Sequence, residues 1–258
     1  MAVQLDTPRT EASRPARTRR RRRRWLLRAA IASMVAATLL AGAMALLLVV
    51  TPSVANAPVL VQQILTAHHE PGDNGVIPTK VADALLATED SRFYSDPALD
   101  PQGTARAIWG LITRNPNEGG ATLEVQLAKL LYTPGRSDPE ALAEQVALAI
   151  KLDHDFTKKQ ILAMYLNAVY FGDGAYGITA AAEHYFGLTP EQLNWGQAAL
   201  LAGLVQAPSA YNPVHHLRLA LLRRDHVLAR LVAVGTLTQA QVRAVQAEPL
   251  DPAVPFTG

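Results

Sequence analysis

Cysteine is absent from the 258-residue sequence. No disulfide can therefore form, and the redox compartment has to be inferred from topology instead. The histidines lack the spacing of a metal-ligand cluster with carboxylate partners, and neither a Ser-His-Asp pattern nor a P-loop motif is present. We interpret the histidines as solvated or packing residues, and the common signatures of serine hydrolases and nucleotide-binding enzymes are excluded.

Alternating polar and apolar residues, which are typical of β-strands, are also missing from the chain after residue 51. Helical spacing interrupted by Pro, Gly and Asn predicts an all-α domain, and the length suits one such domain plus a membrane segment. Apart from one arginine run, there is no low-complexity segment and no internal repeat. The predicted helices span 58–69, 80–89, 102–114, 121–131, 139–153, 157–170, 175–186, 194–206, 215–234 and 238–247.

Positive charge is concentrated at the start of the chain. Residues 1–28 contain ten arginines against Asp6 and Glu11, a balance of +8, whereas the other 14 basic and 20 acidic residues give −6. Nucleic-acid binding usually needs basic residues spread over a folded surface. The sequence therefore predicts a basic tail over residues 1–28 and no nucleic-acid partner.

Residues 29–50 form a run of 22 residues without a charge. As a helix this run would extend about 33 Å, which is enough to cross the hydrocarbon core of a bilayer. Arginine-rich flanks stay on the cytoplasmic side, so residues after Thr51 are expected on the other side, with Trp25 at the interface. We expect residues 51–79 to form a tether and a membrane-proximal helix, and residues 80–258 to form the main domain.

A cleaved signal peptide is the alternative to a permanent anchor. Ala55-Asn56-Ala57 has the small-x-small form of a cleavage site. The apolar run is longer than a normal signal core, and Pro58 would follow the cut, where its ring fits a peptidase badly. We therefore favour the uncleaved anchor.

Two carboxylates, Glu89 and Asp90, follow an apolar helical run, and Phe93 comes shortly after them. An acid at a helix end is ordinarily a solvated cap. It becomes a general base only where burial or neighbouring charge raises its pKa.

A glycine pair at 119–120 precedes a helix that carries Thr122, Gln126 and Lys129. Glycines allow close backbone approach, a helix N-terminus favours anions, and a lysine adds a formal charge. This arrangement predicts an anion-binding site, although Glu124 is an unfavourable neighbour for a phosphate group. Two glycines before a helix are more often only a loop.

Three further segments complete an ordered set. The first lies around Arg136 and Glu144, the second is 156–172 with a Thr157 N-cap and Asn167, and the third is the alanine-rich stretch 180–187. The last two are explicable as helix packing alone.

Together, these segments resemble the glycosyltransferase domain of class A penicillin-binding proteins and monofunctional peptidoglycan transglycosylases, over about residues 80–232. The resemblance implies a lysozyme-like, all-α glycosyltransferase fold. The chain departs from the family pattern at several motif positions, among them Asp96, Ala121, Val125, Gln145 and Ala163.

The resemblance also implies roles for individual residues. Glu89 would be the general base, and Glu144 would be a second catalytic carboxylate. The remaining assignments are Asp90, Thr122, Gln126, Lys129 and Arg136 for substrate binding, and Phe93, Asp100, Arg106 and Asn167 for structural support.

The position of the second carboxylate is open. Counting forward from Arg136 reaches Glu144, whereas counting backward from Leu152-Asp153 reaches Gln145. Adjacent helical positions differ by about 100° in direction, so the two counts point to different faces. We choose Glu144.

The function implied by the resemblance is polymerisation of lipid II into glycan strands, with inversion at the anomeric carbon and release of undecaprenyl pyrophosphate. The expected partners are lipid II, the nascent glycan and the bilayer, with other cell-wall synthesis proteins as further candidates. The family can use a divalent cation, Mg²⁺ or Mn²⁺, but nothing in the sequence dictates one. The expected location is the bacterial cytoplasmic membrane, crossed once, with the N-terminus cytoplasmic and the catalytic domain outside.

Two alternatives stay open. The motif departures are also what a catalytically weak scaffold subunit of cell-wall synthesis would show. A lysozyme-like hydrolase would share the expected fold and one essential acid, but it gives no reason for the 119–129 segment or for a permanent anchor.

Overall fold

The computed structural model describes residues 16–70, 77–96 and 122–257, and of residues 16–24 it describes the backbone alone. The chain divides into two units, residues 1–49 and 50–258. The predicted helix 102–114, the glycine pair at 119–120, Asp100 and Arg106 lie outside the described residues.

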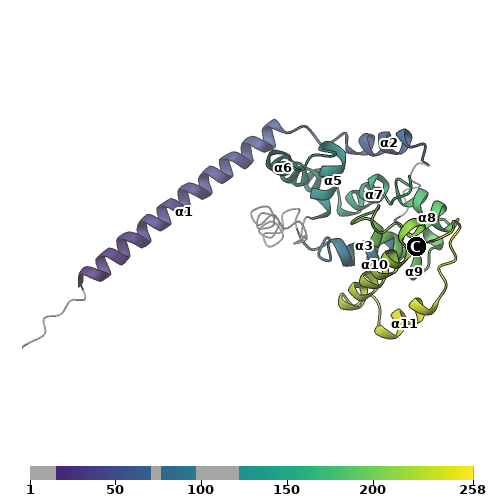
Figure 1. The fold of residues 1–258 in the computed structure, drawn as a ribbon. Helices are drawn as coiled ribbons and strands as arrows, with labels where there is room; N and C mark the ends of the chain where they lie inside the picture. The colour runs from purple at the N-terminus through teal and green to yellow at the C-terminus, as the bar shows by residue number, and fades with distance from the viewer. Residues whose placement is uncertain (1–15, 71–76, 97–121, 258) are drawn as a thin grey trace, which may run out of the picture. The chain divides into compact units, whose positions relative to one another are not determined.

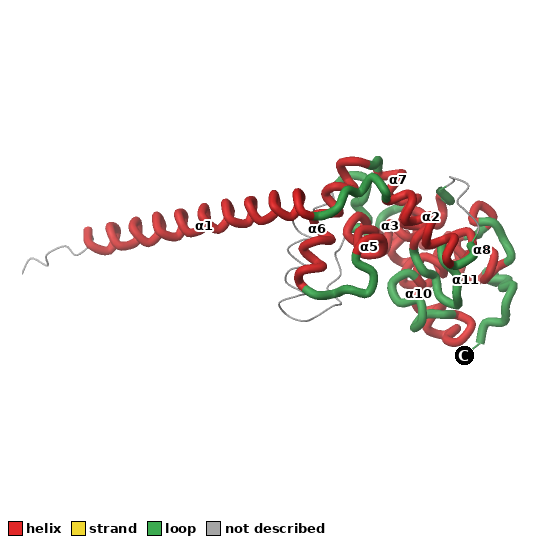
Figure 2. The backbone as a smooth tube through the Cα atoms, turned by 90° about the horizontal axis from the view of Figure 1, so that it is seen from above, coloured by secondary structure: helices red, strands yellow, loops and turns green. Residues whose placement is uncertain are grey.

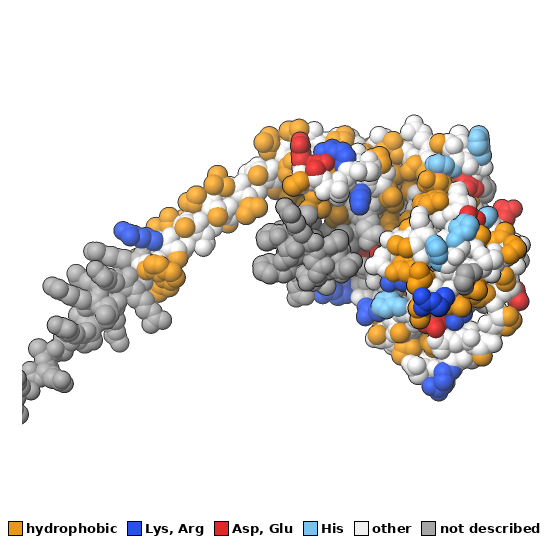
Figure 3. Space-filling model, viewed as in Figure 1, with side chains coloured by type: hydrophobic (Ala, Val, Ile, Leu, Met, Phe, Trp, Pro, Cys, Tyr) orange, Lys and Arg blue, Asp and Glu red, His pale blue; other side chains and the backbone are white. Residues whose placement is uncertain are grey.

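The described part of the first unit lies in α1 (Ala16–Val50), which begins earlier than the predicted start at residue 29. Its stretch Trp25–Val50 is long and apolar enough to cross a membrane, with a mean hydropathy of 2.4. Hydrophobic side chains cover this stretch and none of them is buried (Figure 3). A surface of this kind is costly in water and suits a lipid environment.

The second unit is all-α in its described residues, as predicted (Figures 1 and 2). Its helices are α2 (Ala57–Ala67), α3 (Thr79–Glu89), α5 (Leu123–Tyr132), α6 (Pro139–Asp155), α7 (Lys158–Ala168), α8 (Ile178–Phe186), α9 (Trp195–Leu204), α10 (Pro213–Ala233) and α11 (Gln239–Ala247), with a 3-10 turn at Pro190–Gln192.

Helix α9 is the centre of one half of this unit. All of its residues from Gly196 to Leu204 are buried, and it packs against both α3 and α10. A helix that is apolar on every side is stable only when other elements surround it. In the other half, α5 packs against α6 and α7. A hydrogen bond from the Gln126 amide on α5 to Glu89, the last residue of α3, joins the two halves.

Local signals set the helix ends. Thr157 and Gln160 form a reciprocal capping box at the start of α7, which confirms the predicted N-cap. Gly187 ends α8 in a left-handed conformation, with a φ of 66°. The buried alanines of α8, together with Tyr185 and Phe186, confirm that this segment serves helix packing.

The segment that follows α1 belongs to the second unit and is packed into it. The Lys151 ammonium on α6 donates to the carbonyl oxygens of Thr51 at 2.7 Å and Pro52 at 3.0 Å. Val54 and Ala57 are fully buried in the core. The predicted tether is therefore part of the folded domain.

Candidate active site

Glu89 is the last residue of α3, and helices from both halves of the domain contact its carboxylate. The Gln126 amide on α5 donates to Oε2 at 3.4 Å, and the Arg223 guanidinium on α10 lies 3.4 Å from Oε1. The Glu89 side chain is only 15% exposed. A carboxylate in this position is largely, though not fully, withdrawn from water.

Burial raises the pKa of Glu89 above its ordinary value, although the Gln126 hydrogen bond and the Arg223 charge both lower it. Loss of hydration therefore outweighs the two stabilising partners, as happens where an ion pair is long and desolvated. A raised pKa makes a carboxylate a stronger base. The surroundings of Glu89 thus suit proton abstraction.

Arg223 was not among the predicted residues. Its side chain passes α9 at Gly203, whose carbonyl accepts from Nε at 3.3 Å, and a Cβ at Gly203 would lie 2.9 Å from the Arg223 Cγ. Gly203 therefore leaves the space through which the arginine reaches Glu89. The available sequence signal was a basic residue next to the apolar stripe of α10, three positions after the buried Ala220 and four before Val227.

A second arginine of α10 holds the same end of α3. Arg230 Nε donates to the carbonyl oxygen of Ala87 at 3.0 Å. The last carbonyls of a helix lack partners within the helix, and a nearby cation stabilises them. Arg223 and Arg230 together fix the turn that carries Glu89.

The Gln126 amide is oriented by a buried tyrosine. The Tyr165 hydroxyl on α7 donates to Gln126 Oε1 at 2.7 Å, which leaves the amide nitrogen to face Glu89. Tyr165 is 1% exposed, and burial raises its pKa, so its hydroxyl stays protonated and acts as a donor. Tyr165 was also not among the predicted residues; it lies in the segment 156–172, which the sequence explains as helix packing.

Asp90 caps α5. Its Oδ2 accepts from the backbone N–H of Leu123 at 3.2 Å, and this contact ties the end of α3 to the start of α5. Burial raises the Asp90 pKa, and the Glu124 charge raises it further, against the Leu123 bond and the Lys158 charge. The predicted substrate contact of Asp90 stays a prediction, and the structure gives this residue a structural contact.

The other predicted ligands of α5 share one helix face. Thr122, Gln126 and Lys129 are spaced by four and three residues, so they form a stripe along α5. Gln126 contacts Glu89, whereas Lys129 is exposed and makes no ion pair among the described residues. This stripe places a cation one turn from the amide that touches Glu89.

Glu124 does not face this stripe. Its side chain is 1% exposed, and Oε1 lies 2.6 Å from Nζ of Lys158 on α7. Its charge is therefore compensated inside the protein. The expected repulsion between Glu124 and a phosphate is correspondingly weakened.

The segment around Arg136 and Glu144 forms a separate cluster. Glu144 on α6 is 26% exposed and pairs with Arg136 at 3.1 Å, while Arg136 also contacts Asp138 at 3.2 Å. Gln145 is buried and donates to Thr133 Oγ1 at 2.7 Å. Of the two candidate positions, Glu144 is the accessible one, and no hydrogen bond or ion pair among the described residues joins it to Glu89.

The two described support residues are both buried. Phe93 is 2% exposed, with the Lys158 ammonium 5.0 Å from its ring centroid. Asn167 is 5% exposed and donates to the carbonyl oxygen of Ala163 at 2.9 Å. Both side chains are packed inside the domain.

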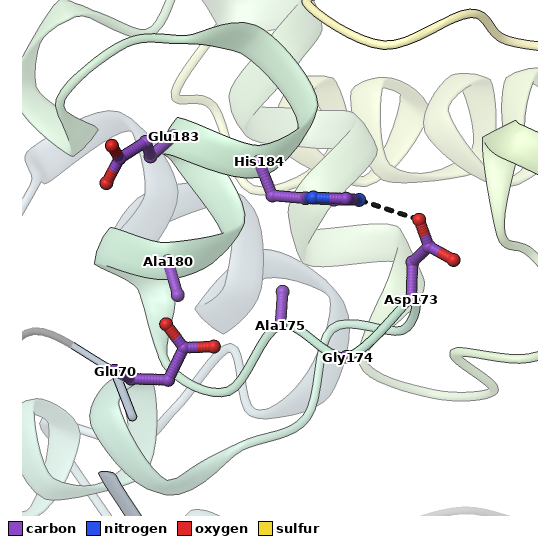
Figure 4. A pocket seen from close by; sticks show the side chains of 7 residues that line it. All are labelled: Glu70, Asp173, Gly174, Ala175, Ala180, Glu183 and His184. Carbon is purple, nitrogen blue, oxygen red and sulfur yellow. Dashed lines mark hydrogen bonds and ion pairs between the residues drawn. The ribbon is translucent and has the colours of Figure 1, made fainter. Parts of the chain in front are cut away.

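A cavity of about 350 Å³ lies elsewhere in the domain (Figure 4). None of the predicted site residues line it. On its wall, His184 Nε2 and Asp173 Oδ2 are hydrogen-bonded at 2.7 Å. Its lining residues are Glu70, Asp173, Gly174, Ala175, Ala180, Glu183 and His184. Within the part of the chain that the structure describes, no three His, Asp or Glu side chains are placed together to hold a metal ion.

Comparison with known proteins defines the class. Residues 59–232 match the family model described as Transglycosylase. The chain therefore belongs to the transglycosylase family, which confirms the resemblance inferred from its motifs.

Penicillin-binding proteins are among the relatives. The chain is 38% identical to penicillin-binding protein 1A of Escherichia coli over 68% of its length and 21% of that protein. It is 41% identical to penicillin-binding protein 1A of Aquifex aeolicus over 67% of its length and 24% of that protein. The chain thus spans less than a quarter of these two relatives.

A relative of similar length also exists. A protein of Cupriavidus necator with a provisional transglycosylase name is 34% identical, over 80% of this chain and 90% of that protein. The solved structure of penicillin-binding protein 1A from Haemophilus influenzae aligns with a TM-score of 0.43 at 23% identity, over 73% of this chain and 18% of that one.

Proposed function

We propose that this protein is a membrane-anchored peptidoglycan glycosyltransferase that polymerises lipid II into glycan strands. Family membership supports the reaction class. The observation that carries the assignment is Glu89, a partly buried carboxylate whose pKa is raised and whose two oxygens are oriented by Gln126 and Arg223.

In the proposed reaction, Glu89 takes the proton from the 4-hydroxyl of the acceptor saccharide. The hydroxyl oxygen then attacks the anomeric carbon of the donor with inversion, and undecaprenyl pyrophosphate leaves with the bonding electron pair. Because Arg223 and Gln126 hold the carboxylate in one orientation, Glu89 loses little freedom when the acceptor binds.

The leaving pyrophosphate gains negative charge as the bond breaks. Lys129 is the exposed cation on the Thr122–Gln126–Lys129 face of α5, and we assign it to stabilise that charge. Arg136 would bind the pyrophosphate of the donor substrate, and its contacts with Glu144 and Asp138 hold the guanidinium in place. Glu144 would then act on the donor side through Arg136.

Membrane attachment would keep the domain next to a lipid-linked substrate. Val54, Ala57 and the Lys151 contacts support an uncleaved anchor, because cleavage after Ala57 would remove a buried part of the domain. The basic N-terminus would stay cytoplasmic and the catalytic domain would lie outside.

The test is polymerisation of lipid II by the full-length protein in detergent, beside a Glu89→Gln variant. Wild type should produce glycan polymer, and Glu89→Gln should lose about 10²–10⁴-fold in rate, the usual contribution of a general base. Glu183→Gln, an exposed acid on α8, is the matched control and should keep full activity.

The products separate the alternatives. Polymer from wild type and Glu89→Gln at equal rates would remove Glu89 from the mechanism. Bound lipid II without polymer would favour the scaffold, and fragments released from isolated cell wall would favour a hydrolase.

A further inference from the structure

Three helices meet at the ammonium of Lys158, the first residue of α7. Its Nζ lies 2.6 Å from Glu124 Oε1 on α5 and 2.8 Å from Asp153 Oδ1 on α6. Glu124 is 1% exposed, whereas Lys158 and Asp153 keep 22% and 26% of their side-chain surface exposed. A buried carboxylate needs such a partner, because an uncompensated charge in the interior is strongly destabilising.

The same ammonium also touches the segment after Glu89. It lies 5.0 Å from the centroid of the Phe93 ring, and Phe93 is 2% exposed. A cation over an aromatic face is attracted by the negative face of the ring, and more strongly where water is excluded. Lys158 therefore contacts the chain four residues beyond the proposed base.

A second connection runs through α5. Asp90, the neighbour of Glu89, accepts from the backbone N–H of Leu123, and Leu123 directly precedes Glu124. The Glu89–Phe93 segment is thus held at two points. The start of α5 holds it at Asp90, and Lys158, which pairs with Glu124 in the first turn of α5, holds it at Phe93.

We propose that Lys158 is a positioning residue that fixes the segment carrying Glu89, by joining the Phe93 ring to the carboxylates of Glu124 and Asp153. This role rests on the proposed function of Glu89. Lys158 does not touch the substrate in this account. It acts through Phe93 and through the end of α5.

A set of variants of the full-length protein separates positioning from simple charge compensation. Lys158→Met leaves the buried Glu124 without its cation, so the unfolding temperature should fall and kcat should drop about tenfold, with KM unchanged. Glu124→Gln keeps the cation over Phe93, held by Asp153, so kcat should stay within about twofold of wild type. Lys159→Met, at the adjacent exposed lysine, is the matched control and should change neither.

The decisive variant combines Glu124→Gln with Lys158→Met. Because no unpaired charge remains buried, its unfolding temperature should return toward the wild-type value, and this variant should fold even if Lys158→Met alone does not. Its kcat should stay about tenfold low, because no cation lies over Phe93. Recovery of kcat together with the unfolding temperature would overturn the proposal and reduce Lys158 to a partner of Glu124.

Hydrogen–deuterium exchange makes the inference independent of activity. Backbone amides of residues 86–96 should exchange faster in the double variant than in wild type or Lys159→Met. Equal exchange would contradict positioning by Lys158. If wild type makes no glycan, the proposed function fails, while this exchange result still decides whether Lys158 holds the segment.

Discussion

Glu89 and Glu144, the two carboxylates predicted to be catalytic, have different surroundings. Glu89 is 15% exposed between a neutral amide and a guanidinium, each 3.4 Å from one of its oxygens, and burial raises its pKa. Glu144 is 26% exposed and pairs with Arg136 at the surface. The difference indicates separate tasks. The charge of Glu89 is only partly compensated, which suits a base, whereas the surface pair of Glu144 with Arg136 fixes the position of the guanidinium.

The largest effect should come from Glu89→Gln, and it should appear in stability as well as in rate. A raised pKa means that the folded state binds the proton more tightly, so this stabilisation is present below the unfolded pKa and is lost as pH rises through the folded value. Near neutral pH, Glu89→Gln should therefore unfold at a higher temperature than wild type.

The check is thermal unfolding from acidic to neutral pH. The unfolding temperatures of wild type and Glu89→Gln should converge as the pH falls toward 4.5, the ordinary pKa of a glutamate. A variant less stable than wild type at neutral pH would contradict the desolvation argument.

Tyr165→Phe should have an intermediate effect. Without the hydroxyl, Gln126 can turn its amide oxygen toward Glu89, and one buried hydrogen bond is lost. We expect kcat to fall about tenfold with a small change in KM. Tyr185→Phe removes another buried hydroxyl, which donates a hydrogen bond to the carbonyl oxygen of Phe171 at 3.1 Å. This variant should lower stability but not kcat. Equal losses of kcat in Tyr165→Phe and Tyr185→Phe would contradict the claim that the Tyr165 hydroxyl orients the Gln126 amide.

Glu144→Gln should have the smallest effect. Arg136 keeps its contact with Asp138, so we expect KM for lipid II to rise about threefold with little change in kcat. Glu140→Gln, at an exposed acid on the same helix, is the control. A loss of kcat as large as that of Glu89→Gln would return Glu144 to the chemistry and remove the contrast between the two carboxylates.

Helix positions were predictable because local signals determine them. The apolar spacing and the Thr157 cap located the described helices of the second unit to within a few residues. The choice between Glu144 and Gln145 was not predictable in this way, since it depends on which face of α6 packs against Thr133.

The partners of Glu89 could not be predicted from local pattern. Arg223 is separated from Glu89 by 134 residues, and its approach depends on the absence of a side chain at Gly203 on a third helix. The compensation of Glu124 by Lys158, 34 residues away, likewise depends on how α5 and α7 pack. Such pairs form through tertiary packing, which single-helix spacing does not encode.

The most direct test of the account is the pH dependence of lipid II polymerisation by wild type and Arg223→Met. The Arg223 charge lowers the Glu89 pKa, so its removal should raise that pKa further and move the acidic limb of the rate profile to higher pH. Arg218→Met, at an exposed arginine on the same helix, should leave the limb in place. An acidic limb that is unchanged in Arg223→Met, or that moves to lower pH, would contradict the assignment of Glu89 as the base.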